Sequence, residues 1–187
     1  MSLALKPMTP DEFLAWEADQ ELKWEFDGLQ PIAMTGGTRS HSVIQRNLLT
    51  ALTIRLRDGV CQPYGSDLKV QTGRSYRYPD AVISCTPFAD SETIVADPVI
   101  VFEILSASTS LIDRTSKLAE YQSVGSVRRV VLIEQDRVFA TVISRATDSW
   151  TIALINDGGS LELPEGAFTV ALSELYGGLA LSADPER

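Results

Sequence analysis

Two carboxylates inside apolar, strand-like segments are the residues of this 187-residue chain best placed to do chemistry. Asp80 lies in the segment 78–84, and Glu103 interrupts the apolar run 98–105. A strand that is apolar on both faces is normally buried on both faces, so a charge within it is costly unless it is paired or binds a metal. If the two strands are neighbours, period-two alternation lets the carboxylates face each other at the ~5 Å strand spacing. A divalent cation between them would relieve their repulsion.

A structural interpretation of the same pattern stays open, in which Glu103 bonds an arginine or a backbone N–H.

The rest of the sequence excludes several classes of site. Cys61, Cys85 and the single His41 are too few for a structural zinc site, and the two cysteines lie in apolar context typical of buried reduced thiols. The chain has no nucleophile elbow, phosphate-binding loop or dinucleotide fingerprint. An enzyme built from these residues is therefore expected to use a magnesium-type cation, which prefers oxygen ligands.

Charge is unevenly distributed along the chain. It carries 16 Lys+Arg and 25 Asp+Glu, a formal net charge of −9, which argues against general nucleic-acid binding. The middle, residues 36–147, is slightly basic and contains a cluster that is either a local basic surface or an ordinary solvated face. The members of this cluster are Arg39, Arg46, Arg55, Arg57, Lys69, Arg74 and Arg77.

The length and hydropathy of the chain predict that residues 1–187 form a single domain. No apolar run approaches the ~18–20 residues of a membrane span. The first ten residues lack a basic start followed by an apolar core, so they do not resemble a signal peptide. We therefore expect no membrane association and a cytoplasmic location.

The elements that must position the carboxylates can be read from periodicity. Thr9, Pro10 and Glu12 predict a capped helix to about residue 18, and Asp27-Gly28 predicts the turn of a hairpin. Apolar spacing predicts a longer helix over 40–57, a second over 113–123 and a helical turn over 170–175. Strands are expected at 66–72, 76–85, 98–106, 129–134, 137–144, 150–155 and 160–163. The pattern predicts an α/β fold with a mixed sheet.

Three motifs follow one another along the chain: Tyr-Pro-Asp at 78–80, Phe-Glu-Ile-Leu-Ser at 102–106, and Asp-Arg-x-x-Lys-x-x-x-Tyr at 113–121. In these motifs the chain resembles the Uma2 family of restriction-endonuclease-like proteins. Earlier matches are Met8-Thr9, Glu12-Phe13-Leu14, Trp24-Glu25-Phe26-Asp27-Gly28, Met34 and Ser40-His41, so it covers roughly residues 8–135. It implies a restriction-endonuclease-like α-β-β-β-α-β core, with a central mixed sheet flanked by helices and extra strands.

The resemblance also implies a function: a metal-dependent nuclease that hydrolyses phosphodiester bonds, in DNA more than in RNA. Asp80 and Glu103 would bind Mg²⁺ or Mn²⁺, and Glu25 would complete the metal site. The wider superfamily carries a lysine two residues after the second acid, where this chain has Leu105. The resemblance points to Lys117 as its replacement, which would steady the attacking hydroxide or the phosphate.

Each of these roles has an alternative. Lys117 could be a surface residue paired with Asp113, four residues earlier on the helix, and Asp113 is expected to cap that helix. Glu25 could form a salt bridge with Lys23 or a nearby arginine. His41 is expected to pack at a helix start rather than contact a substrate phosphate. Tyr121 fits either the site or the core.

Two rival functions remain. Leu105 and the net charge of −9 favour a catalytically inactive relative that binds nucleic acid or a protein partner. The acidic composition also suits an enzyme acting on a small phosphorylated substrate. Because superfamily members often dimerise to cut both strands, analogy suggests a homodimer.

Overall fold

The computed structural model describes residues 7–106 and 111–181, without the side chains of residues 111–113. The helices are α1 (Pro10–Glu17), α2 (Arg39–Leu56), α3 (Leu111–Ser123) and α4 (Leu172–Leu175). The strands are β1 (Trp24–Phe26), β2 (Pro31–Ala33), β3 (Gln62–Gly65), β4 (Val70–Thr72), β5 (Ser75–Arg77), β6 (Ala81–Ser84), β7 (Pro98–Leu105), β8 (Arg129–Glu134), β9 (Phe139–Arg145), β10 (Trp150–Asn156), β11 (Ser160–Leu163) and β12 (Phe168–Ala171).

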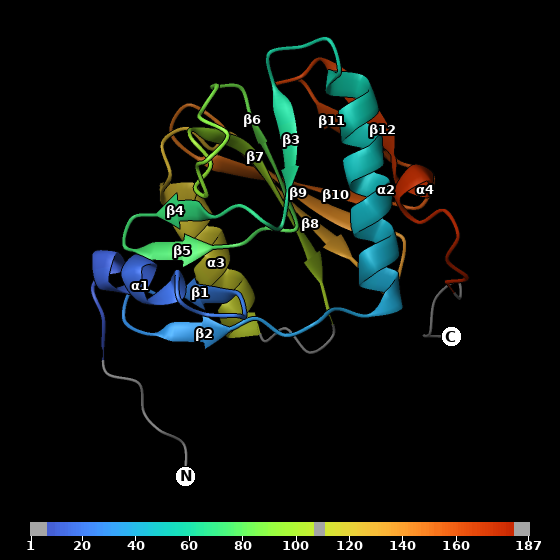
Figure 1. The fold of residues 1–187 in the computed structure, drawn as a ribbon. Coiled ribbons are helices and arrows are strands. Elements are labelled where there is room, and N and C mark those ends of the chain that lie inside the picture. The colour runs from blue at the N-terminus through green and yellow to red at the C-terminus, as the bar shows by residue number, and fades with distance from the viewer. Residues whose placement is uncertain (1–6, 107–110, 182–187) are drawn as a thin grey trace.

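A six-stranded mixed sheet in the order β10-β9-β8-β7-β6-β3 forms the centre of the molecule (Figure 1). Its strands pair antiparallel except β7 and β8, which are parallel and joined through α3. A four-stranded sheet, β2-β1-β5-β4, lies beside it, and β11 and β12 form a separate pair. The expected α/β fold with a central mixed sheet and flanking helices is confirmed.

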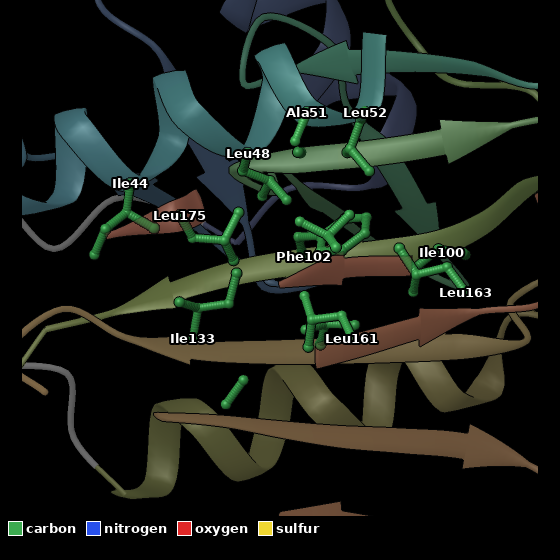
Figure 2. Packing of buried hydrophobic residues seen from close by; sticks show 14 of the residues in the cluster. Ile44, Leu48, Ala51, Leu52, Ile100, Phe102, Ile133, Leu161, Leu163 and Leu175 are labelled. Carbon is green, nitrogen blue, oxygen red and sulfur yellow. The ribbon is translucent and has the colours of Figure 1, made fainter. Parts of the chain in front are cut away.

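The two faces of the central sheet bury different helices. Ile100, Phe102 and Ile104 of β7 pack with Ile44 and Leu48 of α2. Figure 2 shows Ile44, Leu48, Ile100 and Phe102 between helix and sheet. Val101, on the other face, packs with the fully buried Tyr121 of α3. Because Glu103 shares the face of Val101, alternation along β7 directs it toward α3.

The helix cap and the hairpin turn near the N-terminal end of the chain form as predicted. Thr9 caps α1, accepting a hydrogen bond from the Glu12 backbone N–H, while the Glu12 side chain accepts one from Thr9. Strands β1 and β2 form the predicted hairpin, with Asp27 Oδ1 accepting from the backbone N–H groups of Leu29 and Gln30. Gly28 has a φ of 90°, which favours glycine in that turn.

The prediction of one strand over 76–85 is wrong, because the chain passes from one sheet to the other at Tyr78–Asp80. Pro79 has no N–H to give to a strand ladder. The backbone N–H of Tyr78 donates to Glu25 Oε1 at 3.3 Å instead of continuing the strand. Asp80 consequently lies just before β6 rather than inside a strand.

Other element predictions differ in extent. The strand expected over 66–72 is reduced to Val70–Thr72, while β3 and β12 were not predicted. Helix α3 begins at Leu111, so Asp113 lies in its first turn and not at the N-cap position, and its side chain is outside the described residues. No helix within the described residues is long and apolar enough to cross a membrane.

The expectation of two reduced cysteines is also wrong, since Cys61 and Cys85 form a disulfide. Strands β3 and β6 pair antiparallel with Gln62 opposite Ser84, which places the next residues along, Cys61 and Cys85, opposite each other. Each cysteine looked like an isolated apolar residue in the sequence because the pairing depends on strand register.

Candidate metal-dependent active site

The structure brings Asp80 and Glu103 together at the junction of the two sheets. Strands β6 and β7 are antiparallel neighbours with Ala81 opposite Phe102, so the next pair along is Asp80 and Glu103. Asp80 Oδ2 accepts a hydrogen bond from the backbone N–H of Ile104 at 2.7 Å. The carbonyl of Asp80 accepts from Gln45 Nε2 of α2 at 3.0 Å, so this residue is fixed from two elements.

Glu103 is partly buried, and it lies beside like charges. Burial raises the pKa of Glu103 to about 8, and the charges of Asp80 and Glu25 add to the rise. The Lys117 ammonium and a hydrogen bond from Tyr121 oppose it. The Tyr121 hydroxyl donates to Glu103 Oε1 at 2.5 Å, so this fully buried side chain belongs to both the core and the site.

Lys117 reaches the carboxylates from α3. Its Nζ donates to Glu25 Oε1 at 3.0 Å, and its charge acts on Glu103. The side chain is only 21% exposed, so it does not extend into solvent. The alternative pairing with Asp113 concerns a side chain outside the described residues.

Glu25 forms a salt bridge with an arginine as well as with Lys117. Arg77 NH1 donates to Glu25 Oε2 at 3.1 Å, and the same guanidinium donates through Nε and NH2 to both oxygens of Glu120. Together with the N–H of Tyr78, these contacts engage both oxygens of Glu25. Trp24 and Phe26 pack with the α1 core, as expected for an alternating strand.

His41 lies in the first turn of α2, as expected, and also contacts the site. Its Nε2 lies 3.0 Å from Asp80 Oδ1. The hydrogen bond to Asp80 raises the pKa of His41, although burial opposes the rise. A Cβ on Gly37 would lie 2.9 Å from His41 Nδ1, so glycine there permits the loop to pass against the imidazole.

These side chains line a cleft of about 860 Å³ between the two sheets, α2 and α3. Its lining also includes Ile32, Met34, Arg114 and Gln135. Thr38 donates to Gln135 Oε1 at 2.6 Å, which ties the loop before α2 to the end of β8. The cleft therefore carries carboxylates, cations and apolar groups at one place.

The donor set fits a hard cation. Mg²⁺ usually takes one or two carboxylates and completes its coordination with water and substrate oxygens, and Asp80 and Glu103 supply such a pair. The raised pKa of Glu103 reflects a buried negative charge that the neighbouring side chains compensate only in part. Over residues 7–106 and 111–181, no group of three or more His, Cys, Asp and Glu side chains is arranged to hold a metal ion.

The basic cluster predicted over 39–77 does not form one surface. Lys69 is buried against Glu17 and Tyr78, and Arg77 is buried against Glu25 and Glu120. Arg55 pairs with Glu174 of α4. These three cations stabilise internal contacts, whereas Arg46, Arg57 and Arg74 are exposed.

Sequence reasoning missed two contacts of the site. Tyr121 was left open between the site and the core, and its hydrogen bond to Glu103 was not predicted; the available signal was the four-residue spacing from Lys117, which puts both side chains on one helix face. The His41–Asp80 contact joins residues 39 positions apart, and neither spacing nor residue type predicts it.

Fold and site together define a restriction-endonuclease-like protein. The Uma2 family model, described as "Putative restriction endonuclease", matches residues 10–176, and the chain belongs to this family. Two uncharacterized proteins of Synechocystis sp. are similar: slr1290, 32% identical over 92% of this chain and 93% of its own length, and sll1609, 30% identical over 70% and 76%. A crystal structure from Anabaena variabilis, titled a "putative nuclease belonging to DUF820", has the same fold, with a TM-score of 0.75 at 19% identity over 91% of this chain and 98% of that one.

Proposed function

We propose that this chain is a metal-dependent nuclease that hydrolyses phosphodiester bonds of nucleic acid, with DNA as the preferred polymer. Asp80 and Glu103 would hold Mg²⁺ or Mn²⁺. The observation that carries the proposal is the placement of these two carboxylates opposite each other in a cleft that also contains Lys117. The family of the chain supports it.

We assign a separate role in the reaction to each of the neighbouring groups. Lys117 is proposed to replace the lysine absent at Leu105, placing a positive charge where a phosphate or an attacking hydroxide gains negative charge. Tyr121 fixes Glu103 through its hydrogen bond, and the backbone N–H of Ile104 fixes Asp80. The bound cation would polarise a water and neutralise charge on the phosphate.

Glu25 as a third metal ligand stays a prediction. The contacts of Glu25 support a different role in the same site, because Arg77 and Lys117 both donate hydrogen bonds to it. A buried arginine that holds Glu25 in turn fixes the position of the Lys117 ammonium. We therefore propose Glu25 as a residue that positions Lys117, whether or not it also reaches the cation.

Metal binding tests the proposal without a choice of substrate. Calorimetric titration with Mn²⁺ should show one site in the wild type and at least a tenfold weaker site in Asp80→Asn and in Glu103→Gln, since each loses a charged ligand while keeping its shape. Asp90→Asn, an exposed carboxylate outside the cleft, is the matched control and should bind as the wild type does. Equal Mn²⁺ affinity in all four proteins would overturn the proposed site.

A further inference from the structure

Strand β10 ends the six-stranded sheet without the features that usually protect an edge strand. Its residues, Trp150–Asn156, include no charged residue, proline or glycine, and its register with β9 is regular along the whole strand. Edge strands of natural proteins commonly carry charges, prolines or bulges, because a bare edge pairs with strands of other chains. The opposite edge strand, β3, carries Pro63, which has no N–H to offer. The edge at β10 is therefore the open one.

Both faces of β10 are exposed as well as its outer edge. Among the described residues, β9 is the only strand that pairs with it. Ile152 is 67% and Leu154 62% exposed, and both lie on the sheet face of Ile143, which packs with the buried side chains beneath α3. Thr151 and Ala153, on the other face, are also exposed. Two large apolar side chains thus stand next to each other on the surface of an open edge.

The backbone N–H and C=O groups of Ile152 and Leu154 point away from β9. In an antiparallel pair, opposite residues are alternately hydrogen-bonded and not hydrogen-bonded. The N–H of Ala146 donates to the carbonyl of Ser149 at 2.8 Å, and counting in twos from Ser149 assigns the odd-numbered residues of β10 to the ladder with β9. The even-numbered residues consequently present their donors and acceptors to the outer edge.

We propose that this edge is a dimer interface, in which β10 pairs antiparallel with β10 of a second copy of the chain about a twofold axis at Ala153. In this register Ile152 of each copy lies opposite Leu154 of the other. The outward backbone groups of these residues exchange hydrogen bonds, and their four side chains lie together on one face of the sheet. The central sheet continues from one copy into the other.

The pattern of β10 favours a second copy in this orientation. A twofold axis perpendicular to the sheet puts the same face of both copies on the same side, so Ile152 and Leu154 cover each other. A parallel pairing about an axis along the strand would place these side chains on opposite faces and leave them in water. Ala153, which meets its own copy on the axis, has a small side chain. A twofold interface uses the same patch on both copies, so it removes the open edge from both.

Sedimentation velocity over a range of chain concentrations tests the inference. One strand buries less than the ~800 Å² per partner of a standard interface, so the wild type should dimerise in the micromolar range. Ile152→Lys and Leu154→Glu each put a charge opposite an apolar side chain twice in every dimer, and each should weaken dimerisation at least tenfold. Val60→Lys is the matched control, because Val60 is 74% exposed beside β3 at the other edge, and it should dimerise as the wild type does. Thermal melts check that every variant folds.

A mixture of Ile152→Lys with Leu154→Glu tests the register. In the mixed dimer the two introduced charges, of opposite sign, lie opposite each other, and the remaining apolar residues at 152 and 154 also meet. The mixture should therefore dimerise more tightly than either variant alone. Ala153→Cys should form an interchain disulfide on mild oxidation, whereas Thr151→Cys, away from the axis, should not.

Three results would overturn the inference. They are a wild type that stays monomeric at about 1 mM, where even weak specific pairs associate, an Ile152→Lys protein that dimerises as tightly as the wild type, and a mixture no tighter than its components. None of these measurements involves a metal ion or cleavage. Failure of the dimer is therefore distinguishable from failure of the proposed nuclease site, which Mn²⁺ calorimetry measures independently.

Discussion

Among single side chains, Lys117 is the one whose removal should separate binding of metal from chemistry. Lys117→Met keeps the length of the side chain without its charge, so Mn²⁺ should bind the variant at least as well as the wild type. Cleavage of DNA should fall about 10²–10³-fold, the usual cost of losing a group that stabilises transition-state charge. The two measurements are calorimetry and a gel assay under single-turnover conditions.

Arg74→Met removes one positive charge at an exposed position outside the cleft, so it is a charge-matched control for that comparison and should cleave at the wild-type rate. A Lys117→Met protein with full activity would remove Lys117 from the chemistry. The inactive, binding-only alternative would then be judged on the wild type itself, which must cleave with Mn²⁺ for the nuclease proposal to stand.

Glu103 should give the metal-free protein a pH-dependent stability. Its pKa is raised to about 8 in the folded state, above its value in the unfolded chain, so the folded state holds the proton more tightly. The resulting contribution to the free energy of unfolding is fully present below the unfolded pKa and is lost as pH rises through about 8. In EDTA at pH 9, Glu103→Gln should therefore melt at least ~2–4 °C above the wild type.

Addition of Mn²⁺ should reverse that order, because the cation stabilises the ionised wild-type carboxylate and not the amide. Thermal melts at pH 5, 7 and 9 with and without Mn²⁺ provide the measurement. A wild type that is more stable than Glu103→Gln at pH 9 in EDTA would show that burial and the neighbouring carboxylates do not raise the pKa of Glu103.

At the scale of elements, the disulfide joins the start of β3 to the end of β6. A loop of this length stabilises a fold by about 3 kcal/mol in the chain-entropy model, so reduction should lower the free energy of unfolding by about that amount. Urea unfolding with and without dithiothreitol measures it. The double variant Cys61→Ser, Cys85→Ser should be insensitive to the reductant.

An unfolding midpoint of the wild type that dithiothreitol leaves unchanged would contradict the pairing. The cytoplasmic location expected from the N-terminal sequence would expose this pair to cellular reductants, under which such disulfides are rare. The same experiment therefore measures how much stability the chain would have in that compartment.

Elements whose signals are local were predictable from the sequence. The capping box of α1, the Asp27-Gly28 turn and the apolar stripe of α2 are decided by residues within a few positions of one another. The predictions were wrong where distant partners decide. The strand over 76–85 divides because Tyr78 bonds Glu25, 53 residues earlier, and β3 exists through its pairing with β6.

At the scale of the whole molecule, the sequence located the two carboxylates but not their surroundings. An acid in an apolar strand is conspicuous because burial of an unpaired charge is costly. The arginine and lysine that meet Glu25 come from β5 and α3, and only the folded arrangement of two sheets and a helix brings them together. The same folding places two members of the basic cluster, Lys69 and Arg77, in buried ion pairs.

The crossing at Tyr78–Asp80 joins both sheets within three residues, and the site is built on that joint. Tyr78 is fixed to the smaller sheet through Glu25, and Asp80 to the larger sheet and to α2 through Ile104 and Gln45. Any sliding of one sheet against the other must therefore alter the distance from Glu25, in β1 of the smaller sheet, to Asp80 and Glu103 at the larger one. The affinity of the cleft for a cation would then depend on how the two sheets are aligned. Packing as distant as the aromatic core beneath α1 would change that affinity.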